Sequence, residues 1–122
     1  MLLSASSARK SGVSLALQKA DAFLEDFALQ TLWYVRQAGD EVARSFQQAV
    51  ESRLRSLCEQ PRLGRLRRFN HPKLRALRSF SLERPFQNVL IFYREDGVTL
   101  QAVRLMHGAR DLPRRLAESP PS

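Results

Sequence analysis

Two short segments rich in apolar residues, 88–95 and 98–105, flank the dipeptide Asp96-Gly97. Asp-Gly between two apolar runs favours a β-hairpin with a type I′ turn, in which both central residues have positive φ. We therefore predict a β-hairpin centred on this dipeptide. The predicted register pairs Arg94 with Thr99, Phe92 with Gln101, Leu90 with Val103, and Val89 with Arg104.

This register sorts the hairpin into two surfaces, because successive side chains of a strand point to opposite faces. One surface is apolar and should pack on a core; it holds Val89, Ile91, Tyr93, Val98, Leu100 and Ala102. The other is mixed and should line a groove open to a polar or acidic partner; it holds Leu90, Phe92, Arg94, Thr99, Gln101 and Val103.

Two long helices are predicted before the hairpin. Between residues 19 and 38 apolar side chains recur at helical spacing, and Gly39 is placed to end this helix with a positive φ. Asp40 is expected to cap the next helix, which ends before Pro61 and Gly64. A link this short requires the two helices to run antiparallel. The second helix is marked by apolar residues spaced by three or four positions: Val42, Phe46, Val50, Leu54 and Leu57.

The remaining segments complete an α+β fold of order β-α-α-β-β-β. Residues 13–18 are expected to form an edge strand, 73–82 a further strand and 110–117 a short C-terminal helix. The helical hairpin should cover one face of a small, largely antiparallel sheet. Residues 13–117 are thus predicted to be one domain, between a disordered tail (1–12) and a frayed C-terminus (118–122). The expected core is built around Phe23, Phe27, Phe46 and Leu54.

Positive charge is concentrated in the second half of this 122-residue chain. Residues 1–60 hold seven basic and seven acidic side chains, whereas 61–122 hold thirteen and five, which gives the whole net charge of +8. Between Arg62 and Arg78 there are seven basic residues and no acidic one. Such a segment attracts phosphates or an acidic protein segment, although a solvated surface that only aids solubility has the same composition.

Cysteine content and hydropathy narrow the class of protein further. A single cysteine, Cys58, excludes an internal disulfide framework and suits a reducing compartment; its helical position favours a structural thiol. No apolar run approaches the roughly 20 residues that a membrane helix needs. No cluster has the spacing of metal ligands, and no glycine-rich phosphate loop is present. A cytoplasmic protein without metal or cofactor is therefore expected.

Four segments together resemble the RelE/ParE superfamily of bacterial toxins from type II toxin–antitoxin systems, over about residues 15–117. They are LCEQP (57–61) followed by Gly64 and Arg65, the pair Leu77-Arg78, NVLIFYR (88–94), and VRLMHGARD (103–111). The last two are the most specific, because composition and spacing both agree with the superfamily. The resemblance is closest to ParE-like, plasmid-stabilisation members. It implies a small sheet with two N-terminal helices packed on one face.

The resemblance also implies growth arrest, held off by a cognate antitoxin that wraps around the toxin. RelE-like members cleave messenger RNA on the ribosome, whereas ParE-like members poison DNA gyrase. RNA cleavage needs a base, a cation for the developing phosphorane charge and a proton donor. If Asn88 is aligned with the strand glycine of RelE-like enzymes, Leu90 holds the position of their arginine. Their C-terminal tyrosine falls near Leu116, and no tyrosine follows Tyr93. These differences argue against nuclease activity.

The polar candidates that remain have open roles. In a ribonuclease, His107 would act with Arg104 or Arg110, since its ordinary pKa near 6.5 suits neutral pH; the alternative for His107 is a polar residue that closes a strand end. For Arg104 and Arg110, a structural ion pair and direct binding are equally open, and Arg94 is open to pairing with the glutamate beside it. Arg78, in the acid-free stretch, favours partner binding. The predicted partner-binding set is Arg78, Leu90, Phe92, Arg94, Gln101, Arg104, His107 and Arg110.

The expected function is therefore a toxin that inhibits growth by binding and poisoning DNA gyrase, without chemistry of its own. The alternatives are a ribosome-dependent messenger RNA endoribonuclease of RelE type and an inactive relative that only binds an antitoxin. The expected partners are DNA gyrase and an acidic antitoxin that forms a hetero-oligomer with the toxin. Neither membrane association nor sequence-specific nucleic-acid binding is expected.

Overall fold

A computed structural model of the chain describes residues 14–69 and 72–108, without the side chain of Lys73. The elements follow one another as β1 (Ala16–Lys19), α1 (Asp21–Ala38), α2 (Asp40–Glu59), β2 (Arg65–Leu66), a short 3-10 helix (Pro72–Leu74), β3 (Arg78–Ser81), β4 (Val89–Glu95) and β5 (Thr99–His107). The predicted tails, 1–12 and 118–122, and the predicted helix at 110–117 lie outside the described residues.

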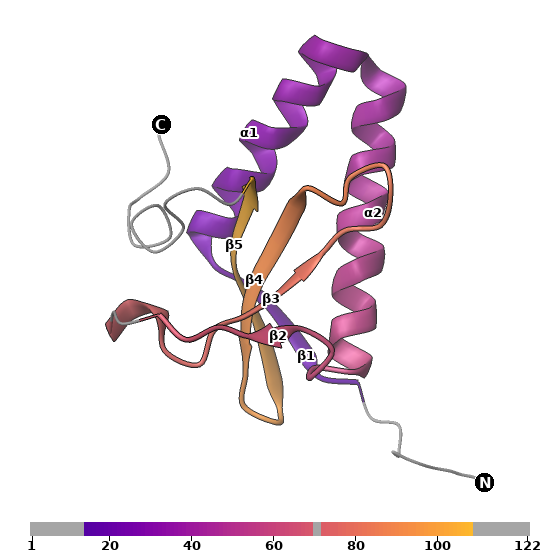
Figure 1. The fold of residues 1–122 in the computed structure, drawn as a ribbon. Helices are drawn as coiled ribbons and strands as arrows, with labels where there is room; N and C mark the ends of the chain where they lie inside the picture. Colours follow the sequence, from indigo (N-terminus) through magenta and orange to yellow (C-terminus); the bar gives the residue numbers. More distant parts are fainter. Residues whose placement is uncertain (1–13, 70–71, 109–122) are drawn as a thin grey trace, which may run out of the picture.

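The strands form one five-stranded sheet in the order β1-β5-β4-β3-β2. β1 runs parallel to β5, and the other neighbouring strands are antiparallel. The antiparallel helices α1 and α2 stand together on one side of the sheet, as Figure 1 shows. The predicted α+β arrangement is confirmed, including the N-terminal edge strand, which lies at 16–19. The sequence did not indicate β2.

Gly39 joins the two helices. It has a φ of 94°, and its N–H donates to the carbonyls of Tyr34 and Val35 at 3.1 Å each. Glycine adopts this φ without steric cost, so the predicted helix end is confirmed. The predicted capping role of Asp40 is wrong, because Gly39 holds the N-cap position and Asp40 is the first residue of α2. Its carboxylate still lies in the first turn, where the helix dipole favours negative charge.

The main core lies between the helices and the sheet. Phe23, Phe46 and Leu54 are almost completely buried, as predicted, whereas Phe27 is only partly buried. Aromatic rings continue through this layer, with centroids 5.8 Å apart for Phe27 and Phe46 and 5.7 Å apart for Phe46 and Phe86. Each large apolar side chain buried here contributes roughly 1.5–3 kcal/mol before entropy is subtracted.

The β4–β5 hairpin turns one residue later than predicted. Its central residues are Gly97 and Val98, because the N–H of Asp96 donates to the carbonyl of Thr99 at 3.2 Å. Of these four residues only Gly97, with a φ of 87°, has a positive φ, which matches a II′ turn and not the predicted I′ turn. Val98 is therefore 72% exposed and does not belong to the core face.

The predicted strand pairs are wrong, but most predicted faces are right. Arg94 pairs with Gln101, and Phe92 with Arg104. Moving the turn by one residue shifts the pairing by two positions, and a shift of two returns each side chain to the same face. An irregularity at Phe92 then offsets β5 by one further residue, so that Leu105 joins the main core.

A second apolar cluster lies on the opposite face of the sheet, beneath the segment before β3. Phe92, Leu74, Leu77 and Met106 are buried in it. The strand predicted at 73–82 is wrong in its first half, because the 3-10 helix and a turn at Ala76, with a φ of 55°, bring the two leucines onto the sheet. The sheet face that was predicted to be open is thus partly covered by the protein's own chain.

Candidate partner-binding face

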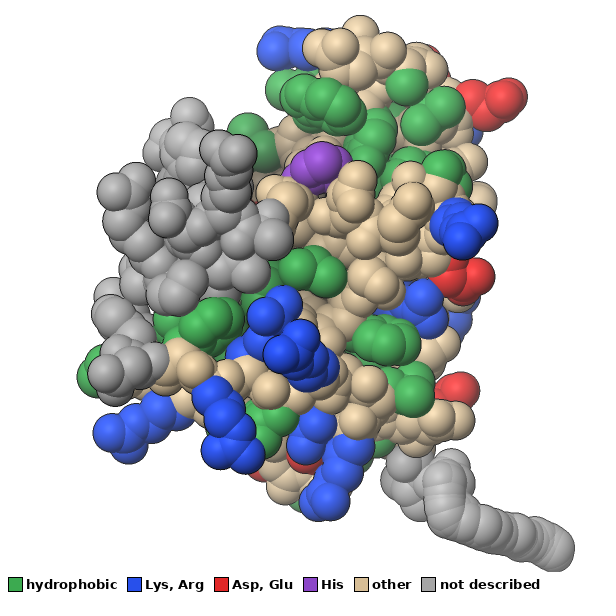
Figure 2. Space-filling view, viewed as in Figure 1, with side chains coloured by type: hydrophobic (Ala, Val, Ile, Leu, Met, Phe, Trp, Pro, Cys, Tyr) green, Lys and Arg blue, Asp and Glu red, His purple; other side chains and the backbone are tan. Residues whose placement is uncertain are grey.

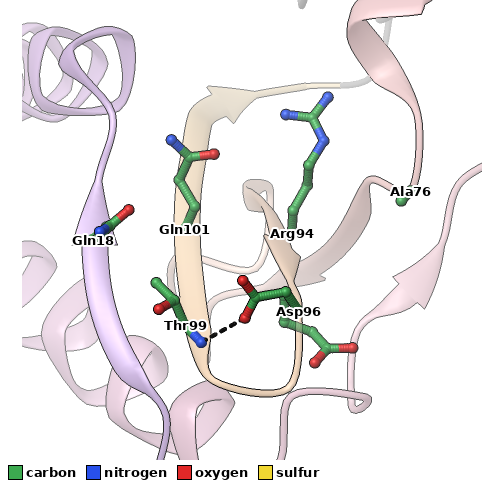
Figure 3. Close-up of a pocket in the computed structure, with 7 residues that line it drawn as sticks. Gln18, Ala76, Arg94, Asp96, Thr99 and Gln101 are labelled. Atoms are coloured by element: carbon green, nitrogen blue, oxygen red, sulfur yellow. Dashed lines mark hydrogen bonds between the residues drawn. The ribbon is translucent and has the colours of Figure 1, made fainter.

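Three strands place polar side chains side by side on the part of this face that remains uncovered. Gln18 of β1 pairs with Gln101 of β5, which pairs with Arg94 of β4. The three residues line a shallow hollow of about 400 Å³, shown in Figure 3. Two members of the predicted partner-binding set, Arg94 and Gln101, are therefore brought together. The lining is completed by Ala76, Glu95, Asp96 and Thr99.

Asp96 lies at the turn end of this hollow. Its Oδ1 accepts hydrogen bonds from the N–H groups of Thr99 at 2.7 Å and Val98 at 2.9 Å. These bonds, that of Thr99 first, lower the pKa of Asp96 below its ordinary value, so the carboxylate is charged at neutral pH. The carboxylate is thereby fixed on its own turn, and the hollow carries charges of both signs.

Arg94 connects the hollow to the segment that covers the second cluster. Its Nε donates to the carbonyl of Arg75 at 2.7 Å, and its side chain is partly buried. Oε1 of Glu95, the neighbour considered as its ion-pair partner, accepts the N–H of Gly97 at 2.9 Å. The guanidinium is thus positioned by a backbone contact, beside side chains from three strands.

Two residues of the predicted partner-binding set are buried. Phe92 has no exposed surface and belongs to the second apolar cluster. Arg104 is 5% exposed, and its guanidinium binds Asp26 of α1 through two hydrogen bonds, Nε to Oδ2 at 2.7 Å and Nη2 to Oδ1 at 3.0 Å. Neither side chain is therefore exposed for a direct partner contact, and Arg104 makes the structural ion pair that was considered for it.

Asp26 was not among the predicted functional or structural residues. Its Oδ2 also accepts the N–H of Leu105 at 3.0 Å, so one carboxylate binds both the side chain and the backbone of β5. The signal was present in the sequence, because Asp26 lies between Phe23 and Phe27 on the apolar face of the helix. An acid at such a position needs a buried partner.

Arg78 faces the helices and not the hollow. It pairs with Tyr93 across β3 and β4, and its Nη1 donates to the carbonyl of Gly64 at 2.9 Å. The hydroxyl of Tyr93 accepts the N–H of Gly64 and donates to the carbonyl of Pro61, both at 2.8 Å. Burial raises the pKa of Tyr93, against a lowering by the Gly64 bond. This phenol is a fixed, protonated core group.

The other predicted residues are dispersed. Leu90 is partly buried at the edge of the second cluster. His107 is exposed at the end of β5, where its ring centroid lies 6.4 Å from that of Trp33 on α1. Arg110 lies outside the described residues. The structure therefore does not bring His107 to the hollow with Arg94.

Within residues 14–69 and 72–108 the structure has neither a candidate metal site nor a membrane-spanning helix. No group of three His, Cys, Asp or Glu side chains there is arranged to hold a metal, and no helix there is long and apolar enough to span a bilayer. Cys58 is buried, and burial raises the pKa of its thiol, with a further increase from the charge of Glu59. This agrees with the structural thiol predicted from its helical position.

Comparisons with known proteins agree with this architecture. A family model described as "ParE toxin of type II toxin-antitoxin system, parDE" matches residues 17–112. A solved structure titled "Chromosomal ParDE TA system from P. aeruginosa" is similar with a TM-score of 0.63 and 21% sequence identity, over 79% of this chain and 98% of that chain. At this identity the similarity supports the fold alone. A search of curated proteins found no match.

Proposed function

The chain belongs to the ParE toxin family of type II toxin–antitoxin systems, and from this membership we propose that it stops growth by binding DNA gyrase and stalling it during DNA cleavage. We further propose that it acts in the cytoplasm. There a cognate acidic antitoxin forms a complex with it and neutralises it.

The observation that carries the choice of gyrase is the placement of the tyrosines. The chain has two. Tyr93 is fixed in the core, and Tyr34 packs against Phe46 and Phe86, with ring centroids 4.9 and 5.3 Å away. Neither is available as a proton donor on the open face, and Leu90 occupies the position at which RelE-like enzymes are expected to carry an arginine. This supports a toxin that acts by binding.

Purified gyrase provides the direct test. We expect the toxin, at a several-fold molar excess, to block supercoiling of relaxed plasmid and to increase the amount of cleaved DNA trapped by denaturant. The matched control is the same toxin premixed with its antitoxin, which should restore supercoiling. Full supercoiling activity in the presence of toxin, together with codon-dependent cleavage of messenger RNA in a translating extract, would reverse the proposal.

His107 distinguishes the proposal from the ribonuclease alternative. Its imidazole is exposed at the end of β5. Among residues 14–69 and 72–108 it is the only histidine on which a RelE-type mechanism could depend. Replacing His107 with alanine should leave toxicity unchanged and alter the free energy of unfolding by no more than about 0.5 kcal/mol, as for most surface positions. Growth after induction and urea unfolding measure these quantities, with Asn88→Ala, an exposed residue beside the same strand end, as the control. Loss of toxicity in a folded His107→Ala protein alone would favour the nuclease.

Induction of the chain without any antitoxin tests the third possibility, an inactive relative. Normal growth at confirmed soluble expression would support that alternative. Both apolar and cationic side chains are exposed to an antitoxin: Trp33 is 49% exposed on α1, and Arg62, Arg65 and Arg68 are exposed in and beside β2. Antitoxin binding that persists at high salt would show that apolar burial dominates over screened charge pairs.

A further inference from the structure

The described residues 62–69 and 72–78 include β2, the 3-10 helix and the first residue of β3, and we call them together the arginine loop. It carries seven basic residues and no acidic one. In Figure 2, Lys and Arg side chains gather over the lower part of the visible face, where β2 and the segment after it lie in Figure 1. An acidic antitoxin could use part of this charge, whereas the proposed gyrase contact and the polar hollow do not account for it. The arginines that the structure describes are Arg62, Arg65, Arg67, Arg68, Arg75 and Arg78.

The positive charge of the arginine loop has no counter-charge among the described residues. The two ion pairs found there join Lys19 to Glu51 and Arg104 to Asp26, and both lie outside the loop. The side chains of Arg65, Arg68 and Arg75 are exposed, and within residues 14–69 and 72–108 they make no hydrogen bond. Within the described part of the chain, these three guanidinium groups therefore have no protein partner.

Arg67 shows that the charges are held close together. Its Nε donates to Oγ of Ser79 at 2.8 Å, and its guanidinium lies 6.0 Å from the ring centroid of Phe69 and 5.9 Å from that of Phe92. Burial lowers the pKa of Arg67, and the positive charge of Arg65 lowers it further. The fold thus fixes one arginine beside another of the same sign, an arrangement that a bound anion would stabilise.

We propose that the arginine loop binds the phosphate backbone of duplex DNA without reading its sequence. Guanidinium groups form forked hydrogen bonds with phosphate oxygens, and several exposed arginines on one segment of the chain match a repeating anion better than a single carboxylate. No base-reading element is required, because phosphate contacts position a protein without specifying a sequence. Its first part includes the edge strand β2, and its second part lies over the sheet face, where Leu74 and Leu77 pack against Phe92.

DNA bound by the arginine loop would be a second contact of the toxin at its target. If the gyrase proposal holds, the loop would bind the DNA that the enzyme is cleaving, and the toxin would be retained at the cleavage complex by both protein and DNA. That step rests on the proposed function, whereas binding of the loop to free duplex DNA does not.

The test measures the affinity of the full chain for a short labelled duplex of arbitrary sequence, by fluorescence anisotropy across a salt series. The variant is the triple change Arg65→Gln, Arg68→Gln and Arg75→Gln. Three lost phosphate contacts should reduce the slope of log affinity against log salt by about 2.7 and weaken binding at least about tenfold near physiological salt. Circular dichroism and thermal unfolding of the variant confirm that the fold is retained.

A matched control distinguishes the contribution of this loop to DNA binding from that of net charge. Arg36, Arg44 and Arg55 are exposed on the helices, so changing these three to glutamine removes the same charge from another surface. The proposal requires the loop variant to lose substantially more duplex affinity than the helix variant. Equal losses would overturn it, because net charge alone would then account for binding.

Two further ligands, tested in the same assay, distinguish DNA from RNA and from a protein partner. A single-stranded RNA of the same length should bind more weakly than the duplex; preferential RNA binding overturns the assignment to DNA. An acidic peptide that binds wild type but not the loop variant, with no duplex binding by either, assigns the loop to a protein partner and also overturns it. If the toxin binds duplex DNA but does not inhibit gyrase, only the gyrase proposal is overturned. If it inhibits gyrase but does not bind duplex DNA, only the proposal of DNA binding by the arginine loop is overturned.

Discussion

Replacing Asp26 with alanine is expected to lower the free energy of unfolding by about 3–5 kcal/mol, because it leaves a buried guanidinium without its counter-charge. The side chains of Asp26 and Arg104 are only 9% and 6% exposed, and the carboxylate makes two hydrogen bonds to the guanidinium and one to the N–H of Leu105. Urea unfolding followed by circular dichroism measures the loss. A change below about 1 kcal/mol, the size usual for exposed pairs, would contradict the buried geometry.

Three further variants show whether the loss of stability comes from the unpaired buried charge. Glu25→Ala removes an exposed acid at the adjacent position of α1, so it should change stability by no more than about 0.5 kcal/mol. Asp26→Asn keeps the shape but removes the charge, and should lie between wild type and Asp26→Ala. The double change Asp26→Leu and Arg104→Met removes both charges together and should recover much of the lost stability, because no unpaired charge is left in the interior.

Replacing Gly64 with alanine is the second change with a large expected effect. A Cβ at this position would meet Oη, Cε1 and Cζ of Tyr93 at 2.3, 2.6 and 2.8 Å. The ring cannot move away without losing its bonds to Gly64 and Pro61, which join the end of α2 to β4. Overpacking and an unsatisfied buried polar group each cost about 1–3 kcal/mol, so we expect a loss of about 2–4 kcal/mol in urea unfolding.

Tyr93→Phe is the comparator for Gly64→Ala. It removes the hydroxyl but leaves the ring in place, so its cost should be the smaller of the two, about 1–3 kcal/mol for two unpaired backbone groups. The double variant should remain destabilised, because two of the three close contacts are to ring carbons and not to the hydroxyl. Equal stability of Gly64→Ala and wild type would show that the backbone at Gly64 moves freely, contrary to the packing described.

The sequence predicted the helices and the apolar faces well, for a local reason. The 3.6-residue period of α2 and the alternation of side chains along a strand indicate which side chains face inward, whatever their partners are. The period of α1 was less informative, because only Phe23 is buried on that helix, while Leu24 and Val35 are exposed. Gly39 indicated the helix end because glycine adopts a positive φ without steric cost, whatever its tertiary contacts are. Its neighbour Asp40 did not become the cap, since a glycine that ends one helix can also begin the next.

The predicted register failed because it depended on one dipeptide. The turn could be centred on Asp96-Gly97 or on Gly97-Val98. The structure has the second turn, in which the carboxylate of Asp96 accepts hydrogen bonds from two backbone N–H groups. An error of two positions is invisible to burial patterns, which explains why the faces were right although the pairs were wrong. The offset at Phe92 had no sequence signal that we can identify.

The candidate surface was predicted less well than the fold. Arg94 and Gln101 do line one hollow, but Phe92 and Arg104 are buried, the first beneath Leu74 and Leu77 and the second against Asp26. Asp26 and Arg104 are 78 positions apart in the chain. Nothing in the period of either element indicates that an acid on a helix and a base on the last strand will meet.

By itself, the sequence of this protein determined the two helices and the hairpin strands, the buried side of α2 and of most of the hairpin, the concentration of positive charge between residues 62 and 78, and the family. These properties depend on neighbouring residues or on composition. Only the tertiary structure decided which charges are used internally and which remain exposed: it buried Arg104 with Asp26, held Arg78 against Gly64 and left Arg65, Arg68 and Arg75 at the surface. The physical reason is that the desolvation and pairing of a charge depend on residues brought together from distant parts of the chain, which no local pattern records.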